Sequence, residues 1–524
     1  MKRYITEKFK YLEPLVLILG SLFISLWTLA RFFLKTPTFD LVGQQNLAYQ
    51  WSKGFHAYSV IGPTNYIWKM FLLYMPLNAI PGSPKVKLMI LTVLINIIVF
   101  VSIYVILKKL LRLFMPTIGL GYYLAIFWFA LISGSVYWIQ FTNSRNLELV
   151  GGLLLVYLII RNIKKENKPR YAILILLSSL LFFADPLQLY MSAVPGLAYL
   201  GLFTYKNKKS DFVRYVFIVL SVVVGLGLSK IIIALVSKST GAVLIAVTTH
   251  TNGYNTIQTV IHGTVPALKQ MGRLYVGGHE LGWLIEGMNL VMVAGVLLVG
   301  LYYFLGKKIN KQLVYMCLSF WLLGIFFYIV SGQSLQTQTS RYLIVTVPIF
   351  IVYLTAVMTV DSKLRRYLIA GLIALIFIDM LGVIKVFDTS TDQASSSDAH
   401  VQSAISFMKD NGYKYGYSSA DLALPADYFS NQSITLLPLT CGGQNNLAQS
   451  YLFFDKSFYQ HAQLKMNGLI PVIIDGSTIN NYPNSCGLDS AYKIFGTRPS
   501  MTHLSDGSLV LIYSASEINL VIGH

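Results

Sequence analysis

The sequence has few charged residues, few cysteines and no nucleotide-binding glycine loop. Only 12% of its 524 residues are Asp, Glu, Lys or Arg, about half the share found in soluble domains, which excludes an ordinary soluble protein. Three cysteines are present, without a CxxC pair or a His/Cys cluster of zinc spacing, which excludes a zinc ribbon or finger. The absence of a Walker-type loop argues against ATP-driven transport.

Long apolar runs are abundant instead. Hydrophobic residues make up 55% of the chain, and they come in blocks long enough to cross a hydrocarbon core of roughly 30 Å. We therefore predict an α-helical polytopic membrane protein of about eleven transmembrane helices. The expected spans lie near residues 15–34, 88–107, 117–138, 147–160, 171–184, 187–204, 215–236, 283–304, 312–330, 341–359 and 367–386.

The chain divides into a membrane domain, residues 1–387, and a small C-terminal α/β domain, residues 399–524. Outer loops are expected at 35–87 and 237–282, and the Ser/Asp-rich stretch 388–398 is expected to be a linker. In the C-terminal domain, Val401–Asp410 reads as a helix, and Leu469–Ile474 and Ser508–Tyr513 read as strands. Cys441 and Cys486 both fall in this domain, and spacing alone does not decide whether they form a disulfide.

The net charge of +19 is unevenly distributed. Residues 1–387 hold 35 Lys/Arg against 11 Asp/Glu, whereas residues 388–524 hold 6 against 11. The basic residues lie in short alternate loops, not on one face as nucleic-acid binding requires. By the positive-inside rule, the N-terminus is cytoplasmic and the C-terminal domain extracytoplasmic. The expected location is the plasma membrane, with a multi-pass topology.

Few ionisable residues are expected on the outer side at membrane depth, where charge is costly and is often functional. They include Asp40, Arg145, Glu148, Asp185 and Arg341. A carboxylate such as Asp40 could act as a general base toward a hydroxyl. Each also has a structural alternative. Asp40 could be an interfacial cap, Arg145 and Glu148 a local i, i+3 pair, Asp185 a turn residue before Pro186, and Arg341 a snorkelling side chain.

The order of short motifs resembles the GT-C superfamily of membrane glycosyltransferases, which includes polyprenyl- and dolichyl-phosphate-sugar-dependent mannosyl- and arabinosyltransferase-like enzymes. Asp40 follows the first span and precedes an Ala-x-x-hydrophobic-x-x-Gly segment at residues 48–54. Asn143–Glu148 opens a later span, and Ser340–Leu343 is similar to a recurrent Arg-Tyr-Leu entry. Phe407–Tyr417 looks like the start of the outer domain in some members.

The resemblance implies a sugar donor on a polyprenyl phosphate and a glycan, lipid or protein acceptor. Asp40 would remove the proton from the acceptor hydroxyl as it attacks the anomeric carbon with inversion, transferring a hexose or a pentose. Arg341 would bind the departing phosphate, Arg145 could share that charge, and Asp185 and Glu148 are possible second acids.

The sequence also departs from the superfamily pattern. Many relatives have Asp-Glu where this chain has Asp40-Leu41, and many carry a Lys where Asp185-Pro186 stands. We therefore predict no cofactor and no metal, and a divalent ion is an unsupported alternative. Two other functions stay open, namely a transporter or flippase for a lipid-linked glycan and a non-catalytic membrane scaffold. Membrane lipids are expected partners, and nucleic acid is not.

Overall fold

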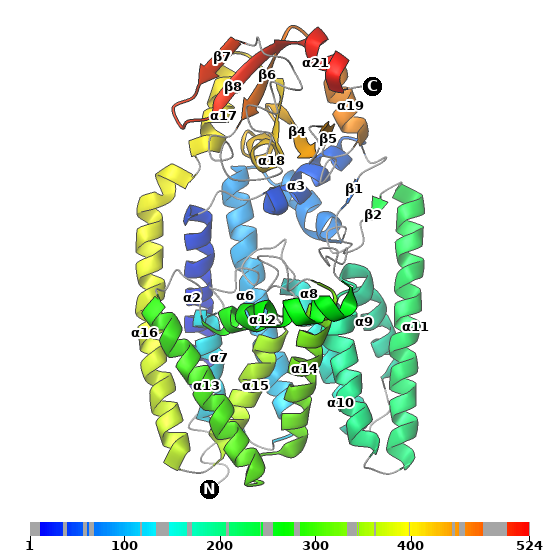
Figure 1. The fold of residues 1–524 in the computed structure, drawn as a ribbon, viewed down its shortest axis with the longest axis vertical. Helices are drawn as coiled ribbons and strands as arrows, with labels where there is room; N and C mark the ends of the chain where they lie inside the picture. The colour runs from blue at the N-terminus through cyan, green and yellow to red at the C-terminus, as the bar shows by residue number, and fades with distance from the viewer. Residues whose placement is uncertain are drawn as a thin grey trace. The chain divides into compact units, whose positions relative to one another are not determined.

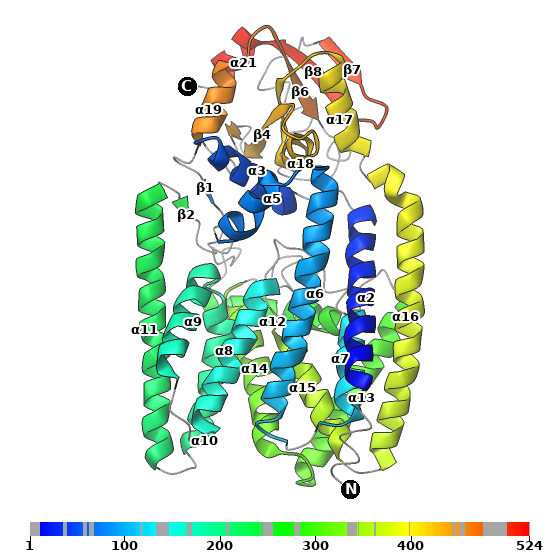
Figure 2. The ribbon, with the colours of Figure 1, turned by 180° about the vertical axis from the view of Figure 1, so that it is seen from behind.

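A computed structural model of the chain is mostly helical and divides into two compact units. The first, here called the helical unit, comprises Met1–Leu29, Thr92–Ile233 and Val247–Asp388. The second, here called the α/β unit, comprises Ala30–Leu91, Ala234–Ala246 and Thr389–His524. Figures 1 and 2 show the elements of both from opposite sides.

The structure describes residues 11–34, 39–55, 60–61, 68–115, 118–132, 146–164, 170–205, 209–240, 243–244, 255–276, 283–332, 343, 345–360, 363–397, 399–442, 446–449, 456–474 and 500–522.

Every apolar block predicted from the sequence coincides with a described helix, which confirms a polytopic helical membrane protein. By length and composition, seven helices within the described residues can cross a membrane. These are α2 (Leu12–Leu34), α6 (Pro84–Leu111), α8 (Asn146–Lys164), α11 (Lys209–Thr240), α13 (Trp283–Leu305), α14 (Lys311–Val330) and α16 (Lys363–Ser397). The shorter apolar helices are α7 (Leu120–Ile132), α9 (Tyr171–Ala184), α10 (Val194–Tyr205), which follows the π-helical turn η2 (Leu189–Ala193), and α15 (Thr346–Thr359). A count of eleven crossings stays a prediction.

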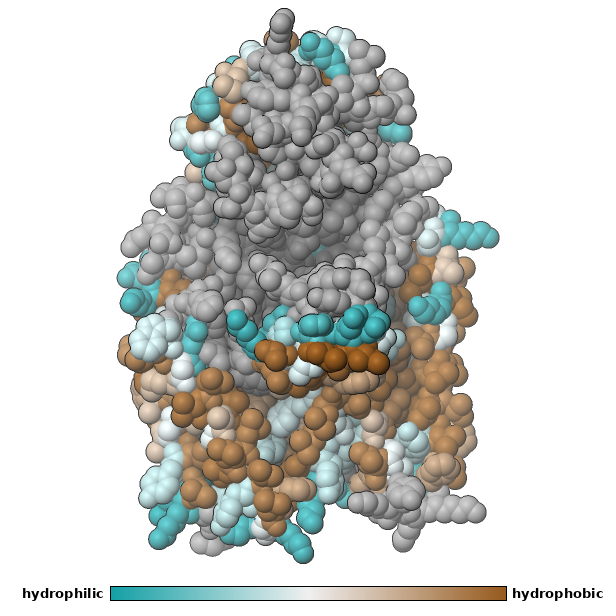
Figure 3. All heavy atoms as spheres, viewed as in Figure 1, coloured by the Kyte–Doolittle hydropathy of each residue, from teal (hydrophilic) through white to brown (hydrophobic). Residues whose placement is uncertain are grey.

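Two of the short helices, α7 and α15, lie in the interior of the helical unit, and longer helices have apolar faces at its surface. Helices α7 and α15 pack against each other and are buried along almost their whole length, as expected of helices that are hydrophobic on all sides. In contrast, α13 exposes Val291 and Leu298 by 73% and 67%. Figure 3 shows a mainly hydrophobic surface over these helices. Such a surface is compatible with lipid and not with water.

The sequence analysis did not anticipate a long amphipathic helix, α12 (Thr256–Val276), within the expected second outer loop. Its exposed apolar residues Ile257, Ile261, Val265 and Leu268 recur every three or four positions and form one stripe, and Figure 3 shows hydrophilic and hydrophobic residues on opposite sides of this helix. The buried Gln270 accepts a hydrogen bond from the hydroxyl of Tyr328 in α14. This two-sided pattern is typical of a helix that lies in the membrane interface.

The C-terminal part of the α/β unit contains a six-stranded sheet with the order β5-β4-β3-β6-β8-β7. Its strands are β3 (Tyr415–Ser419), β4 (Thr435–Gly442), β5 (Asn446–Gln449), β6 (Leu469–Ile474), β7 (Ser500–His503) and β8 (Leu509–Ser514). The central β3 pairs in parallel with β4 and β6, and the outer pairings are antiparallel. The predicted small α/β domain is confirmed, with β6 at its expected bounds and β8 displaced by one residue.

Two helices, α17 (Ala399–Asp410) and α18 (Ala420–Phe429), pack on this sheet. Val401, Ile405 and Met408 of α17 enter a buried cluster with Leu422 of α18 and Val510 of β8. The predicted helix at 401–410 is therefore confirmed, and its apolar i, i+4 spacing explains which face it buries. Two further helices of this part are α19 (Lys456–Leu464) and α21 (Ala515–Ile522).

The first expected outer loop belongs to the same unit as this sheet. It contains α3 (Phe39–Ser52), the π-helical turn η1 (Met70–Tyr74) and α5 (Met75–Ala79). Its short strand β1 (Val60–Ile61) pairs in parallel with β2 (Val243–Leu244) of the second expected outer loop.

The contact between α3 and α18 is polar at its centre. The buried Asn46 of α3 donates from Nδ2 to the carbonyl oxygen of Leu424 at 2.7 Å and accepts at Oδ1 from Nε2 of Gln432 at 2.6 Å. Asn431 and Gln432 both have positive φ, 58° and 60°, so the chain turns directly after α18 in a conformation that Asn tolerates better than most residues. This turn places the Gln432 amide against Asn46.

The Ser/Asp-rich stretch that was expected to be a linker is mostly helical. Helix α16 continues without interruption as far as Ser397, and α17 begins at Ala399. Residues 388–397, most of this stretch, are therefore helical.

We predict that Asn46→Ala lowers the free energy of unfolding of the α/β unit by about 1–3 kcal/mol, because it removes the buried hydrogen bond to the carbonyl oxygen of Leu424 and the partner of the half-buried Gln432 amide. The matched control is Asn411→Ala, which removes one exposed, local hydrogen bond to the carbonyl oxygen of Phe407 and should change stability by less than about 0.5 kcal/mol. Denaturant unfolding of the purified chain measures both. Equal effects would show that Asn46 does not stabilise the contact.

Candidate functional site

The predicted site residues differ in how far the structure describes them. Asp40 is the second residue of α3, where its backbone is helical but its side chain lies outside the description. Arg145 and Arg341 lie outside the described residues. Glu148 is in the first turn of α8 and is 2% exposed, and Asp185 lies between α9 and η2 and is fully buried.

The start of α8, which carries Glu148, is held by a chain of buried amides. Asn146, the first residue of α8, donates from Nδ2 to Oδ1 of Asn96 in α6 at 2.9 Å. Asn96 in turn donates to the hydroxyl of Thr28 in α2 at 3.0 Å. All three side chains are almost fully buried, and a buried hydrogen-bond chain of this kind fixes geometry. Three helices therefore hold the segment that directly follows Arg145.

Asp185 organises the break between α9 and η2. Its Oδ1 accepts from the backbone N–H of Leu187 at 3.3 Å, and its Oδ2 accepts from Nε2 of Gln188 at 3.2 Å. The Oε1 of Gln188 accepts from the hydroxyl of Ser192 at 2.9 Å. Asp185 thus makes the turn that its structural alternative predicted, and a catalytic role for it stays a prediction.

Glycine at position 152 lets α8 approach this network closely. A Cβ atom at Gly152 would lie 2.3 Å from Oε1 of Gln188 and 2.4 Å from the hydroxyl of Ser192. Glu148 precedes Gly152 by four residues and therefore lies on the same face of α8. The two candidate acids, Glu148 and Asp185, consequently belong to packed, neighbouring parts of the helical unit.

Helix α3 has two buried side-chain amides without hydrogen-bond partners among the described residues, close in sequence to the hydrogen-bonded Asn46. Gln44 and Gln45 are 1% and 0% exposed, and none of their side-chain nitrogen or oxygen atoms has a hydrogen-bond partner among the described residues. Such atoms are rare in native structures and need an explanation, such as a ligand that they bind. Gln44 follows Asp40 by four residues, so both positions lie on one face of α3.

A buried lysine accompanies these amides in the α/β unit. Lys69, at the start of the helical segment that continues into η1, is fully buried, with its Nζ 5.5 Å from the centre of the Trp68 ring. Residues 68–79, within the expected outer loop at 35–87, are helical. The unusual signal in the sequence was one cation within an aromatic and apolar run.

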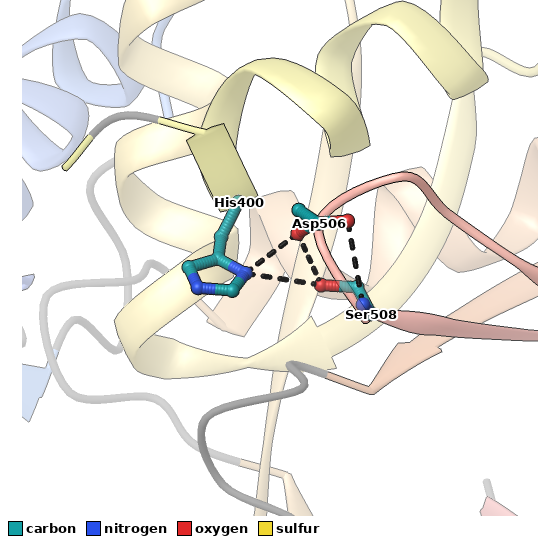
Figure 4. A network of polar contacts seen from close by, with 3 residues as sticks. All are labelled: His400, Asp506 and Ser508. Atoms are coloured by element: carbon teal, nitrogen blue, oxygen red, sulfur yellow. Dashed lines mark hydrogen bonds and ion pairs between the residues drawn. The ribbon is translucent and has the colours of Figure 1, made fainter. Parts of the chain in front are cut away.

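A His-Asp-Ser cluster in the C-terminal domain is structural and not a catalytic triad. Asp506 Oδ2 lies 2.6 Å from Nδ1 of His400 and 2.6 Å from the hydroxyl of Ser508, and Figure 4 shows how the three side chains face one another. A triad needs the serine at the histidine nitrogen opposite the aspartate, but here Ser508 is also on the Nδ1 side, at 3.4 Å. Burial raises the pKa of Asp506, yet the hydrogen bonds from Ser508 and His400 outweigh it and hold the pKa below its ordinary value.

An acidic residue that the sequence analysis did not single out lies within the helical unit. Asp379 of α16 is fully buried, and its two oxygens accept from Nε1 of Trp128 in α7 and Nδ2 of Asn289 in α13, both at 3.1 Å. An acid inside an apolar span was the available signal. The cluster joins three helices. Because both carboxylate oxygens of Asp379 already accept hydrogen bonds, its burial is explained without a ligand.

The described residues contain no group of three or more His, Cys, Asp or Glu side chains placed to hold a metal ion. Cys317 is a fully buried residue of α14, as expected of a small core side chain. Cys441 lies in β4, whereas Cys486 lies outside the described residues.

Neither a family model nor a curated protein matches the sequence. Among solved structures, ArnT from Cupriavidus metallidurans bound to undecaprenyl phosphate matches with a TM-score of 0.54 at 10% identity, covering 96% of this chain and 99% of that one. Its apo state matches with a TM-score of 0.49 at 10% identity over the same shares. The oligosaccharyltransferase of Archaeoglobus fulgidus, in complex with Zn and sulfate, matches with 0.46 at 12% identity, covering 94% of this chain and 72% of that one. The likeness to ArnT shows that the two chains share a fold, which agrees with the resemblance to the GT-C superfamily drawn from the sequence.

We predict that Gln44→Leu preserves or raises the thermal stability of the ligand-free protein, because it removes a buried amide that has no partner. Gln188→Leu is the matched control, since this amide is equally buried but bonded at both ends. It should cost about 1–3 kcal/mol. Thermal unfolding in detergent compares the two variants. A loss at Gln44 as large as that at Gln188 would contradict the prediction.

Proposed function

We propose that this chain is an integral membrane glycosyltransferase that transfers a sugar, with inversion, from a polyprenyl-phosphate donor to a cell-envelope acceptor at the outer face. The observation that carries the proposal is the fold match to ArnT bound to undecaprenyl phosphate, which extends over 96% of this chain and 99% of the other. A match over nearly both full lengths includes the membrane helices and the C-terminal domain together.

Fold alone does not assign activity, so the proposal also depends on specific residues. We assign the general base to Asp40. Its carboxylate would take the proton of the acceptor hydroxyl while the hydroxyl oxygen attacks the anomeric carbon. The bond from that carbon to the phosphate oxygen then breaks, and the polyprenyl phosphate leaves with the bonding electrons. The support for this assignment is the position of Asp40 in α3, a helix fixed by Asn46 to Leu424 and Gln432.

We assign binding of the departing phosphate to Arg341, and we assign to Arg145 a share in neutralising the negative charge of that phosphate. A guanidinium presents a planar fork of donors that matches phosphate oxygens, and stabilising the charge that develops on the leaving group is a large electrostatic contribution to catalysis. The chain of amides from Thr28 through Asn96 to Asn146 supports the second role, because it anchors the residue next to Arg145.

We assign Gln44 and Gln45 to the hydroxyl groups of a sugar. Their amides are buried and unpartnered among the described residues, and an amide can both donate to and accept from a hydroxyl. Gln44 shares a helix face with Asp40, which suits a residue that orients the reacting sugar. Glu148 and Asp185 are kept as candidate second acids, of which Asp185 already uses both oxygens in hydrogen bonds.

The proposed topology has a cytoplasmic N-terminus and an extracytoplasmic C-terminal domain in the plasma membrane, as the distribution of Lys and Arg indicates. Such an orientation suits a lipid donor whose head group lies at the membrane surface. The sugar is a hexose or a pentose, and the acceptor is a glycan, a lipid or a protein.

We predict that Asp40→Asn lowers sugar transfer at least about a hundredfold, because an amide is a far weaker base of nearly the same size. The matched control is Asp410→Asn, which makes the same change at the exposed C-terminal end of α17 and should leave transfer unchanged. Transfer is measured with purified protein, radiolabelled polyprenyl-phosphate sugars and membrane extract as the source of acceptor.

Thermal unfolding of both variants shows whether they are folded. If folded Asp40→Asn transfers sugar as fast as the native protein, Asp40 is not the base, although the chain is still a transferase.

A further inference from the structure

A cavity of about 310 Å³ opens on the α/β unit, apart from the buried amides of α3. It is formed by the C-terminal end of α3, the chain segments that enter β3 and β4, and helix α19. Its volume is at the lower end of the roughly 300–1,000 Å³ that small-molecule sites occupy, which is room for one or two sugar-sized rings.

Three lysines line the cavity. Lys53, Lys414 and Lys465 contribute to its wall together with the ring of His461, and none of the described residues that line it is acidic. This is unexpected for its surroundings, because residues 388–524 carry 6 basic against 11 acidic side chains. Two of those six basic residues are in this one wall. A cluster of cations in an acidic domain creates a local field that attracts anions.

In the described part of the chain, none of these three lysines forms an ion pair with a carboxylate. The Nζ of Lys53 lies 5.5 Å from the centre of the Tyr49 ring, and that of Lys414 lies 5.9 Å from the centre of the Tyr415 ring. A cation–π contact of this kind orients an ammonium group without cancelling its charge. Lys53 and Lys465 each follow the end of a helix, where the helix dipole favours a cation. Lys414 precedes a strand, so a helix dipole does not explain its position.

Aromatic rings complete the wall. Phe55 meets Phe458 edge to face with centroids 5.1 Å apart and lies 5.2 Å from the ring of His461, while Tyr49 and Tyr415 add two rings with hydroxyl groups. Rings that are partly accessible in a concave site supply flat apolar area with polar edges. The apolar C–H face of a sugar ring is complementary to that area, and its hydroxyls can reach the tyrosines and Gln432.

We propose that this cavity binds an acidic sugar unit of the acceptor, with its phosphate or carboxylate on Lys53, Lys414 and Lys465 and its ring against Phe55 and Phe458. The term acceptor rests on the proposed function, but the binding itself does not. The cavity thus selects a negatively charged glycan.

Titration calorimetry of the full-length purified protein tests this without any donor. The probes are trigalacturonate as a carboxylated glycan, glucose 6-phosphate as a phosphorylated sugar, maltotriose as a neutral glycan, and inorganic phosphate. We expect at least one acidic sugar to bind about tenfold or more tighter than maltotriose, with an affinity that falls as salt is added.

Three variants test where the acidic sugar binds. The affinity for the acidic sugar should fall about tenfold or more in the triple variant of the cavity, Lys53→Gln/Lys414→Gln/Lys465→Gln. It should change less than about twofold in a control that removes the same charge outside the cavity, Lys307→Gln/Lys308→Gln/Lys311→Gln. Phe55→Leu should weaken the acidic sugar and leave inorganic phosphate unaffected.

The inference is overturned if maltotriose binds as tightly as both acidic sugars, if the cavity triple variant binds like the native protein, or if inorganic phosphate matches the acidic sugars, which would indicate an adventitious anion only. Binding of an acidic sugar without any donor turnover would leave the cavity standing and remove the proposed function. Donor turnover without binding of an acidic sugar would remove the cavity proposal and leave the proposed function standing.

Discussion

The hydrogen bonds of Asn46 are the constraint on which the proposed arrangement depends most. They join residues 378 positions apart in the sequence, since the partner carbonyl belongs to Leu424. Through them the helix that follows the first span becomes part of the C-terminal fold. The carboxylate of Asp40 is carried by this same helix, so its backbone position depends on a domain made at the far end of the chain. Another hydrogen bond from α18 joins remote segments of this unit, because the hydroxyl of Tyr428 donates to the carbonyl oxygen of Pro84.

A second theme is the difference between polar groups that are satisfied and those that are not. Asp379 and Asp185 are buried, but donors meet both oxygens of each carboxylate, so each is explained by the packing of its own helices. Gln44 and Gln45 have no such explanation among the described residues. An evolved fold tolerates buried unpaired amides chiefly where function requires them. This contrast, more than the presence of acids, is what distinguishes α3.

The sequence predicted what hydropathy and local periodicity encode. Each apolar block became a helix, and the strand at Leu469–Ile474 was placed at its observed bounds. Helix α12 was missed because an amphipathic interfacial helix lacks a continuous apolar run. The partners of Asn46 and the convergence of Lys53 with Lys414 and Lys465 could not be predicted, because they join segments that are remote along the chain. The stretch 388–398 was expected to be a linker from its composition, and the preceding helix extends through residues 388–397.

The central claim is that the chain breaks the bond between a sugar and a polyprenyl phosphate, and does not merely move the intact lipid across the membrane. The most direct measurement is to reconstitute the native protein in liposomes with undecaprenyl-phosphate-linked sugars and membrane extract, and to follow both free undecaprenyl phosphate and the anomeric configuration of the product. We predict release of undecaprenyl phosphate that depends on the acceptor, with inversion at the anomeric carbon. Movement of intact donor between leaflets without release of the phosphate, for every donor tested, would contradict the account and favour a flippase.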